Sequence, residues 1–286
     1  MKNLLSELFD REGVTIDEMD LFAREVLQKI ILNGLSRGQF FKRAAFHGGT
    51  ALRILHSLGR YSEDLDFKLF ERDPDFKLER YLSYVVSEAE SYGLTVRSKV
   101  REGGLSNVST GDIRCNEREL VMEIGFPNEW VKSLGRDTVV RVKIDVDTDP
   151  SYGAKYEKYS MKYPLNYYLC ALDLPSMFAG KLGAVLTRRW GMREKGRDFY
   201  DYLWYVESEI PINMEYMRAN LERAKVLSPD DEFNIDVLRD MLRKRFESAD
   251  YASILSDVEK FIIGQRPPSH WGPETFIVTL PNLKVQ

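Results

Sequence analysis

The sequence of 286 residues is poor in the residue types that define several classes of protein. Its two cysteines, Cys115 and Cys170, form no CxxC pair and no cluster with histidine, so we expect neither a zinc site nor a disulfide framework. The three histidines, His47, His56 and His270, form no arrangement with serine or cysteine typical of a nucleophilic catalyst. A nucleophile-dependent hydrolase is therefore not indicated.

Long apolar runs are also missing. No stretch of eighteen apolar residues occurs, which indicates no membrane-spanning helix and no membrane partner. The first ten residues carry acidic side chains and no apolar run, which is not typical of a signal peptide. We accordingly expect a cytoplasmic location.

An excess of positive charge is absent as well. The net charge is −4 and the pI about 5.6, so overall charge gives no reason to expect non-specific binding of nucleic acid. Any contact with RNA or DNA would need a local basic patch. With 43% apolar and 30% charged residues, the chain can bury a core and keep a solvated surface.

The first half of the chain predicts mixed helix and strand. Thr15 and Glu18 have the spacing of a capping box before a helix that reaches Leu35. A strand is expected over 43–47, a helix from the Gly48-Gly49 turn to near Gly59, and a strand at the alternating residues around 64–69. Further on we expect a helix over 75–92 and strands near 94–102, 106–114, 118–126 and 138–147.

The second half predicts helices. After Pro164 the pattern becomes helical, and helices are expected near 175–189, 195–207, 213–224, 234–248 and 251–263. The proline-rich tail from Gln265 is expected to be an extended arm with a short strand at 276–278. The fold class predicted is α+β, with a mixed-sheet domain over 1–164 that includes N-terminal helices and a helical domain with the extended tail over 165–286.

The most informative segment runs from His47 to Phe67 and joins a Gly-Gly turn, a helix and an Asp-x-Asp strand. Asp64 and Asp66 are two residues apart on the expected strand, so both side chains leave one face. Paired carboxylates repel each other unless a cation or water satisfies them, and carboxylate oxygens are the ligands that Mg²⁺ prefers. Glycines at a helix N-terminus let phosphates approach the backbone N–H groups. Together these features indicate phosphoryl or nucleotidyl transfer.

A third carboxylate would complete a two-metal site, and two residues compete for this role. Asp145 lies on the polar side of the 138–147 strand, and we favour it. Glu123 lies on the polar side of the strand expected over 118–126 and is the alternative.

A basic cluster marks the start of the helical half. Lys181 and Arg188 are seven residues apart and share one face of a helix. The positive charges exceed the nearby acids, which favours neutralisation of phosphate over an ordinary solvated face. The cluster comprises Lys181, Arg188, Arg189, Arg193, Lys195 and Arg197.

These segments together resemble the AbiEii/AbiGii-type nucleotidyltransferases of the DNA polymerase β-like superfamily. Gly48-Gly49-Thr50 with Ser62-Glu-Asp64-Leu-Asp66-Phe67 is similar to the first motif of the family. Lys143-Ile-Asp145 is similar to its third-carboxylate strand, Lys181 with Arg188 to its second motif, and the segment 193–201 to its last. The resemblance spans roughly residues 40 to 206. It departs from the family pattern at Gly49, which replaces a serine.

For the α/β half, the resemblance implies that Asp64 and Asp66 bind two Mg²⁺ (or Mn²⁺) ions, with Asp145 as third ligand. Gly48 and Gly49 would hold the β- and γ-phosphates of an NTP, and Thr50 is the available substitute for the missing serine hydroxyl.

For the helical half, the resemblance implies that Lys181 holds the triphosphate, with Arg188 and Arg197 as further NTP-binding residues. Asp198 would orient basic partners such as Lys181 or Arg197, or assist removal of a proton.

The resemblance also implies a toxin of a toxin–antitoxin or phage-defence pair, with a cognate antitoxin as partner. The first functional hypothesis is transfer of a nucleoside monophosphate to RNA, at a tRNA 3′ end. The acidic chain leaves a protein or small-molecule acceptor as an alternative. The replacement of serine by Gly49 leaves open a non-catalytic NTP-binding regulator.

Overall fold

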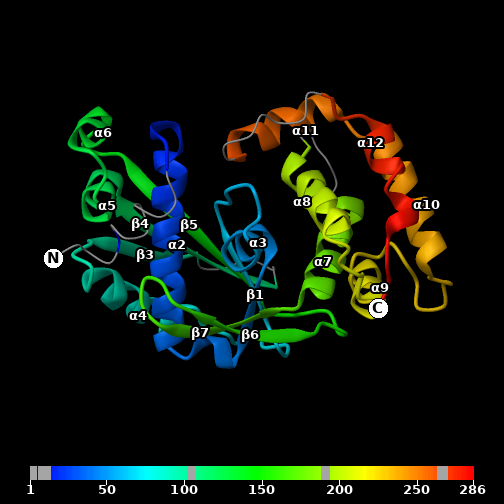
Figure 1. The fold of residues 1–286 in the computed structure, drawn as a ribbon. Coiled ribbons are helices and arrows are strands. Elements are labelled where there is room, and N and C mark those ends of the chain that lie inside the picture. The colour runs from blue at the N-terminus through cyan, green and yellow to red at the C-terminus, as the bar shows by residue number, and fades with distance from the viewer. Residues whose placement is uncertain (1–4, 6–13, 102–106, 188–193, 263–269) are drawn as a thin grey trace. The chain divides into compact units, whose positions relative to one another are not determined.

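The computed structural model describes residues 5, 14–101, 107–187, 194–262 and 270–286 (Figure 1). Contacts divide the chain into two compact units. Unit 1 consists of Met1–His56, Tyr61–Pro150 and Glu157–Ala171, and unit 2 of Ser57–Arg60, Ser151–Tyr156 and Leu172–Gln286. The chain therefore passes from one unit to the other several times. The domain boundary predicted near residue 165 stays a prediction.

A seven-stranded sheet with the order β3-β4-β5-β2-β1-β7-β6 forms the centre of unit 1. Strand β2 occupies the middle, antiparallel to β1 and parallel to β5, while β4 pairs antiparallel with both β5 and β3. The sheet is thus mixed, as the sequence predicts. The strands are β1 (Ala44–His47), β2 (Leu65–Leu69), β3 (Val96–Val100), β4 (Val108–Asn116), β5 (Val139–Asp147), β6 (Tyr156–Met161) and β7 (Tyr167–Leu172).

Helices pack against the apolar side of this sheet. Strand β5 alternates between buried and more exposed residues, and its buried side chains, from Val140 to Val146, meet the long helix α2. Helices α2 and α4 approach closely because Gly34 has no side chain: a Cβ there would lie 2.6 Å from the Cα of Val85. The helices of unit 1 are α2 (Met19–Arg37), α3 (Gly48–His56), α4 (Glu79–Glu90), α5 (Glu117–Ile124) and α6 (Asn128–Ser133), with 3-10 turns η1 (Ile16–Glu18) and η2 (Phe40–Lys42).

Unit 2 is helical around an aromatic core. The rings of Phe199, Tyr202, Phe246 and Phe276 contact one another with centroid separations from 5.1 to 6.1 Å. Because each ring buries a large apolar surface, this cluster contributes substantially to the stability of the unit. The helices are α7 (Leu174–Thr187), α8 (Gly196–Glu207), α9 (Met214–Arg223), α10 (Ile235–Glu247), α11 (Tyr251–Val258) and α12 (Pro273–Ile277), with 3-10 turns η3 (Glu259–Phe261) and η4 (Leu280–Asn282).

Most of the predicted elements are confirmed, and three predictions are wrong. The strand expected over 118–126 is helix α5, which Asn116 caps by accepting from the Glu119 N–H at 3.1 Å. Its apolar residues Leu120, Val121 and Ile124 have helical spacing, which the strand interpretation overlooked. Glu123 therefore lies on a helix.

The other two errors concern segments set by long-range packing. The residues after Pro164, where the pattern was expected to become helical, first form strand β7, which pairs with β1 through Phe46 and Ala171. The expected strand at 276–278 is replaced by helix α12, because Phe276 inserts into the aromatic core of unit 2. Among the described residues, no helix is both long enough and apolar enough to cross a membrane.

Candidate active site

The Asp-x-Asp strand lies between two strands that carry other predicted site residues. On β2, Asp66 pairs in register with Asp145 on β5 and with His47 on β1. Residues paired across neighbouring strands project from the same face of a sheet. The structure therefore brings together Asp66, Asp145 and the end of β1, which are distant in sequence.

Gly48 closes this arrangement from the β1 side. It follows His47, begins helix α3 and has a φ of 85°, a conformation that residues with a side chain rarely adopt. A Cβ at Gly48 would lie 2.7 Å from the Oδ2 of Asp66, so the backbone touches the space next to this carboxylate. The Gly-Gly turn and the Asp-x-Asp strand are thus one local structure, with the N-terminus of α3 beside Asp66.

Asp64 and Thr50 connect helix α3 to the same strand. Asp64 directly precedes β2 and is exposed, whereas Thr50 is buried in the first turn of α3. The hydroxyl of Thr50 donates a hydrogen bond to the backbone carbonyl of Asp64. This bond fixes the loop that carries Asp64, so Thr50 has a positioning role that the sequence did not indicate. Its role in binding NTP stays a prediction.

Asp145 is held by two donors on its own sheet. Thr110 on β4 donates to its Oδ1 at 2.7 Å, and the ammonium group of Lys143 lies 2.5 Å from its Oδ2. The side chain of Asp145 is 22% exposed, so the carboxylate is ordered but reachable. Of the two residues considered for the third carboxylate, Asp145 is the one whose strand pairs with Asp66, whereas Glu123 lies on helix α5.

The donor chemistry of this face suits a hard divalent cation. Asp66 and Asp145 share a face through their register, and Gly48 leaves space at the Asp66 carboxylate. Within the described parts of the chain, however, no three His, Cys, Asp or Glu side chains are gathered closely enough to hold a metal ion. The metal set of Asp64, Asp66 and Asp145 therefore stays a prediction.

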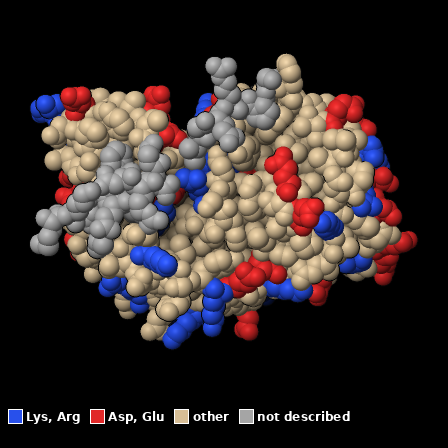
Figure 2. All heavy atoms as spheres, viewed as in Figure 1, with Lys and Arg blue, Asp and Glu red and all other residues tan. Residues whose placement is uncertain are grey.

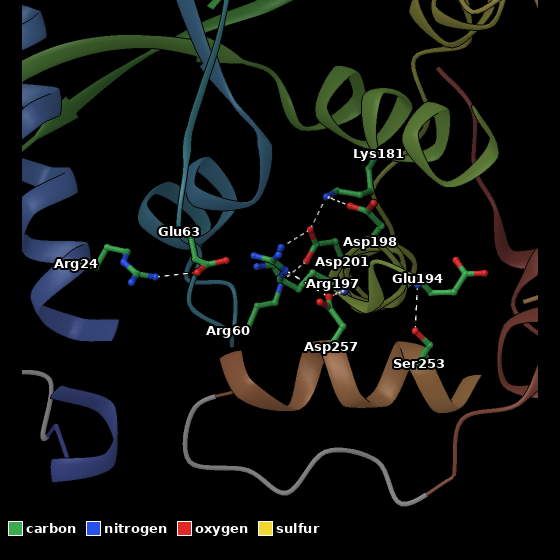
Figure 3. A network of polar contacts seen from close by, with 10 residues as sticks. All are labelled: Arg24, Arg60, Glu63, Lys181, Glu194, Arg197, Asp198, Asp201, Ser253 and Asp257. Carbon is green, nitrogen blue, oxygen red and sulfur yellow. Dashed lines mark hydrogen bonds and ion pairs between the residues drawn. The ribbon is translucent and has the colours of Figure 1, made fainter. Parts of the chain in front are cut away.

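In unit 2, Lys181 lies in a buried network of charges (Figure 3). Its ammonium group is 2.8 Å from the Oδ1 of Asp198 and 2.8 Å from the Oδ2 of Asp201. Arg60 donates to both carboxylate oxygens of Asp201, at 2.7 and 2.6 Å. Two cations and two anions thus neutralise one another, and the side chain of Lys181 is only 11% exposed.

The pKa values of this network favour the charged forms. Burial acts to lower the pKa of Lys181, but Asp198 and Asp201 outweigh it and the pKa is raised. Burial likewise acts to raise the pKa of Asp201, yet Arg60 and Lys181 hold it below its usual value. Lys181 is therefore a fixed cation at neutral pH.

The other residues predicted for the site in the helical half are Arg197, Asp198 and Arg188. Arg197 contacts Asp257 at 3.5 Å and lies 4.2 Å from the ring centroid of Phe261, while Asp198 is paired with Lys181. Arg188 and the neighbouring basic residues up to Arg193 lie outside the described residues. Arg60 was missed, because an arginine in a loop gives no local signal that its partner lies 141 residues away.

Comparison with known proteins decides the family. The family model described as "Nucleotidyl transferase AbiEii toxin, Type IV TA system" matches residues 30–267 of the chain. The chain belongs to the AbiEii family. It is accordingly a nucleotidyltransferase of a type IV toxin–antitoxin system, and the family implies an antitoxin partner and a nucleotide substrate. The resemblance seen in the motifs is thereby confirmed.

Two solved structures from Helicobacter pylori are similar to this AbiEii protein. One is described as a nucleotidyltransferase candidate, with 16% identity, a TM-score of 0.49, and coverage of 90% of this chain and 89% of that one. The other, JHP933, also has 16% identity and a TM-score of 0.49, with coverage of 91% and 88%. No protein with a curated description matches significantly. The family assignment therefore depends on the match over residues 30–267.

Proposed function

We propose that this AbiEii protein transfers a nucleoside monophosphate from an NTP to a hydroxyl of RNA, at a tRNA 3′ end, and so acts as a toxin. The observation that carries the proposal is the alignment of Asp66 with Asp145 next to Gly48, where a Cβ would meet the Asp66 carboxylate. The family match supports the reaction class.

The reaction joins the acceptor to the α-phosphate. The oxygen of the acceptor hydroxyl attacks the α-phosphorus, and the bond from that phosphorus to the oxygen bridging to the β-phosphate breaks in line. Pyrophosphate leaves with the bonding electrons, and the hydroxyl proton passes to solvent. Positioning and neutralisation of charge supply most of the rate enhancement in such reactions, which suits a site made of carboxylates and backbone N–H groups.

In this proposal, Asp64, Asp66 and Asp145 would hold Mg²⁺ or Mn²⁺, which would neutralise charge on the phosphates. The N–H groups at the start of helix α3, at Gly48 and Gly49, would bind phosphate oxygens, because a helix N-terminus carries partial positive charge.

In the helical unit, Lys181 stays a predicted NTP-binding residue. Its ion pairs with Asp198 and Asp201 hold the ammonium group in one position. Asp198 is then a positioning residue for Lys181. Arg188 and Arg197 stay as predicted NTP-binding residues.

The proposal is tested by incubating the protein with labelled NTPs, Mg²⁺ and total RNA. We expect labelled RNA from the wild type and at least about a hundredfold less from Asp66→Asn, because electrostatic groups of this kind contribute on that order. Asp75→Asn removes an exposed carboxylate of the same unit and serves as the matched control. Label in a protein band rather than in RNA would contradict the RNA acceptor. Equal labelling of RNA by wild type and Asp66→Asn would contradict the site.

A further inference from the structure

The strands β3, β4 and β5 carry an unusual set of side chains on the face that also bears Asp66 and Asp145. Arg97, Arg114 and Arg141 are paired in register across the three strands and form an arginine row. Residues paired in this way project from one face, so three guanidinium groups lie side by side. All three side chains are exposed.

The next positions along the strands continue this charge toward the catalytic carboxylates. Two residues from the arginine row, a second row consists of Lys99, Asp112 and Lys143, which are paired in register. Two residues further, Thr110 on β4 pairs with Asp145 on β5. Alternate residues of a strand share a face, so these rows and the arginine row form one surface. We call it the basic face, and its cations are Arg97, Lys99, Arg101, Arg114, Arg141 and Lys143.

One buried carboxylate organises the guanidinium groups of the basic face. Asp112 is only 3% exposed and accepts a hydrogen bond from Arg141 at 2.6 Å, with Arg101 at 3.8 Å and Arg114 at 3.9 Å. Asp112 holds these guanidinium groups in position, and the three arginines outnumber it. Arg101 and Arg114 remain 57% and 53% exposed, so they are available to a ligand.

The arginine row also lines a hollow. A cavity of about 730 Å³ is bordered by Arg97, Arg114 and Arg141, together with Asn116 and the two carboxylates of Glu119 and Asp137. Its volume falls in the range of pockets that enclose a small ligand, roughly 300–1,000 Å³. Arg141 and Asp145 are four residues apart on β5, which places the row about 13 Å from the catalytic carboxylate.

We propose that the basic face binds the phosphate backbone of the acceptor RNA and directs its 3′ end toward Asp145 and Asp66. This inference rests on the proposed function. Arginine forks match phosphate oxygens in pairs, and the rows extend from the cavity toward the catalytic carboxylates. The face of the molecule in Figure 2 carries both basic and acidic side chains. Because the chain has a net negative charge, it needs a local positive surface such as the basic face to hold RNA.

The chemistry of the basic face favours RNA over a protein acceptor. A protein interface normally contains a core of aromatic and apolar residues. The cavity lining instead consists mainly of charged and polar side chains, with Val139 and Cys115 as its apolar members. The expected recognition is therefore of backbone phosphates, with little dependence on base sequence.

The test uses the triple variant Arg97→Gln/Lys99→Gln/Arg114→Gln of the full chain. It spares Arg141, which satisfies the buried Asp112. The matched control, Lys42→Gln/Lys77→Gln/Arg80→Gln, removes the same charge from exposed positions of the same unit. Equal melting temperatures of the two variants would show that the fold is retained.

We expect the KM for RNA to rise roughly tenfold or more in the triple variant, with the KM for NTP changed less than about twofold, relative to the control. The RNA dissociation constant, measured in the Asp66→Asn background, should rise in parallel. Its dependence on salt should weaken by about 2 in logarithmic slope, since about 0.7 is lost per single-strand phosphate contact.

Two outcomes would overturn the inference: an RNA affinity and salt slope equal to the control, or a loss confined to NTP binding. RNA binding that depends on the basic face, in a wild type that labels no RNA, would support the surface and contradict the proposed reaction. The two proposals can therefore fail separately.

Discussion

At the scale of the residue, Gly48 makes the sharpest prediction about the active site. Gly48→Ala places a methyl group 2.7 Å from the Oδ2 of Asp66 and forces a side chain into a φ of 85°. We expect the free energy of unfolding to fall by about 1–2 kcal/mol and kcat to fall by roughly a hundredfold, because Asp66 must move. Steady-state labelling and chemical denaturation measure the two effects.

Gly272→Ala is the control for this change, because nothing lies within 4 Å of a Cβ at that position. If Gly48→Ala kept the activity of this control, the contact with Asp66 would have no catalytic importance.

The residue scale is also where the sequence was most informative. Asp64, Asp66, Gly48 and Gly49 lie within one short segment, so their spacing alone predicted a shared structure. Asp145 could be chosen from strand periodicity but not joined to Asp66, because register between strands is a long-range property.

At the scale of the element, helix α5 makes the stability of the protein depend on pH. Glu117, its first residue, is only 8% exposed. Burial, and then a hydrogen bond and repulsion from Asp20, raise its pKa from 4.5 to about 7 against the smaller opposing effects of Thr138 and Arg24. The folded state binds this proton more tightly than the unfolded state, so the stabilisation is complete below pH 4.5 and is lost as the pH rises through about 7.

Glu117→Gln should therefore raise the melting temperature at pH 8 relative to the wild type and have little effect at pH 5. Melting curves at both pH values measure the difference. Glu90→Gln, at an exposed position of helix α4, is the control. A stabilisation that is the same at both pH values would show that Glu117 does not titrate in this range.

The elements that the sequence missed have causes beyond local pattern. Strand β7 follows Pro164 in a region that otherwise predicts helix. Its place beside β1 depends on the pairing of Ala171 with Phe46, which lies about 125 residues earlier in the chain. The basic face illustrates the same limit. Sequence spacing indicated a basic cluster around Lys181, whereas the cations of β3, β4 and β5 gather only through their register.

At the scale of the whole molecule, the buried pair of Arg60 and Asp201 ties two distant parts of the chain. Asp201 is 0% exposed, and Arg60→Gln would leave it and Asp198 with Lys181 as the remaining cation of the network. We expect the free energy of unfolding to fall by about 3–5 kcal/mol, the usual cost of removing one partner of a buried ion pair. Denaturant unfolding measures the loss.

Arg72→Gln is the control, since Arg72 forms an exposed ion pair with Asp149 at 3.3 Å and its side chain is 71% exposed. That change should cost no more than about 1 kcal/mol. Equal effects of the two changes would contradict the structural importance of the Arg60–Asp201 pair.

The separation of Arg60 from Asp201 also has a consequence for synthesis on the ribosome. Asp201 is translated 141 residues after Arg60, which takes on the order of ten seconds at typical elongation rates. During that time the nascent chain already carries Asp64 and Asp66, but the segment before them lacks its anchor on α8. A polypeptide released early would contain the Asp-x-Asp motif without Lys181, Asp198 or Asp201. Chains that end before Asp201 would thus be unable to assemble the charge network.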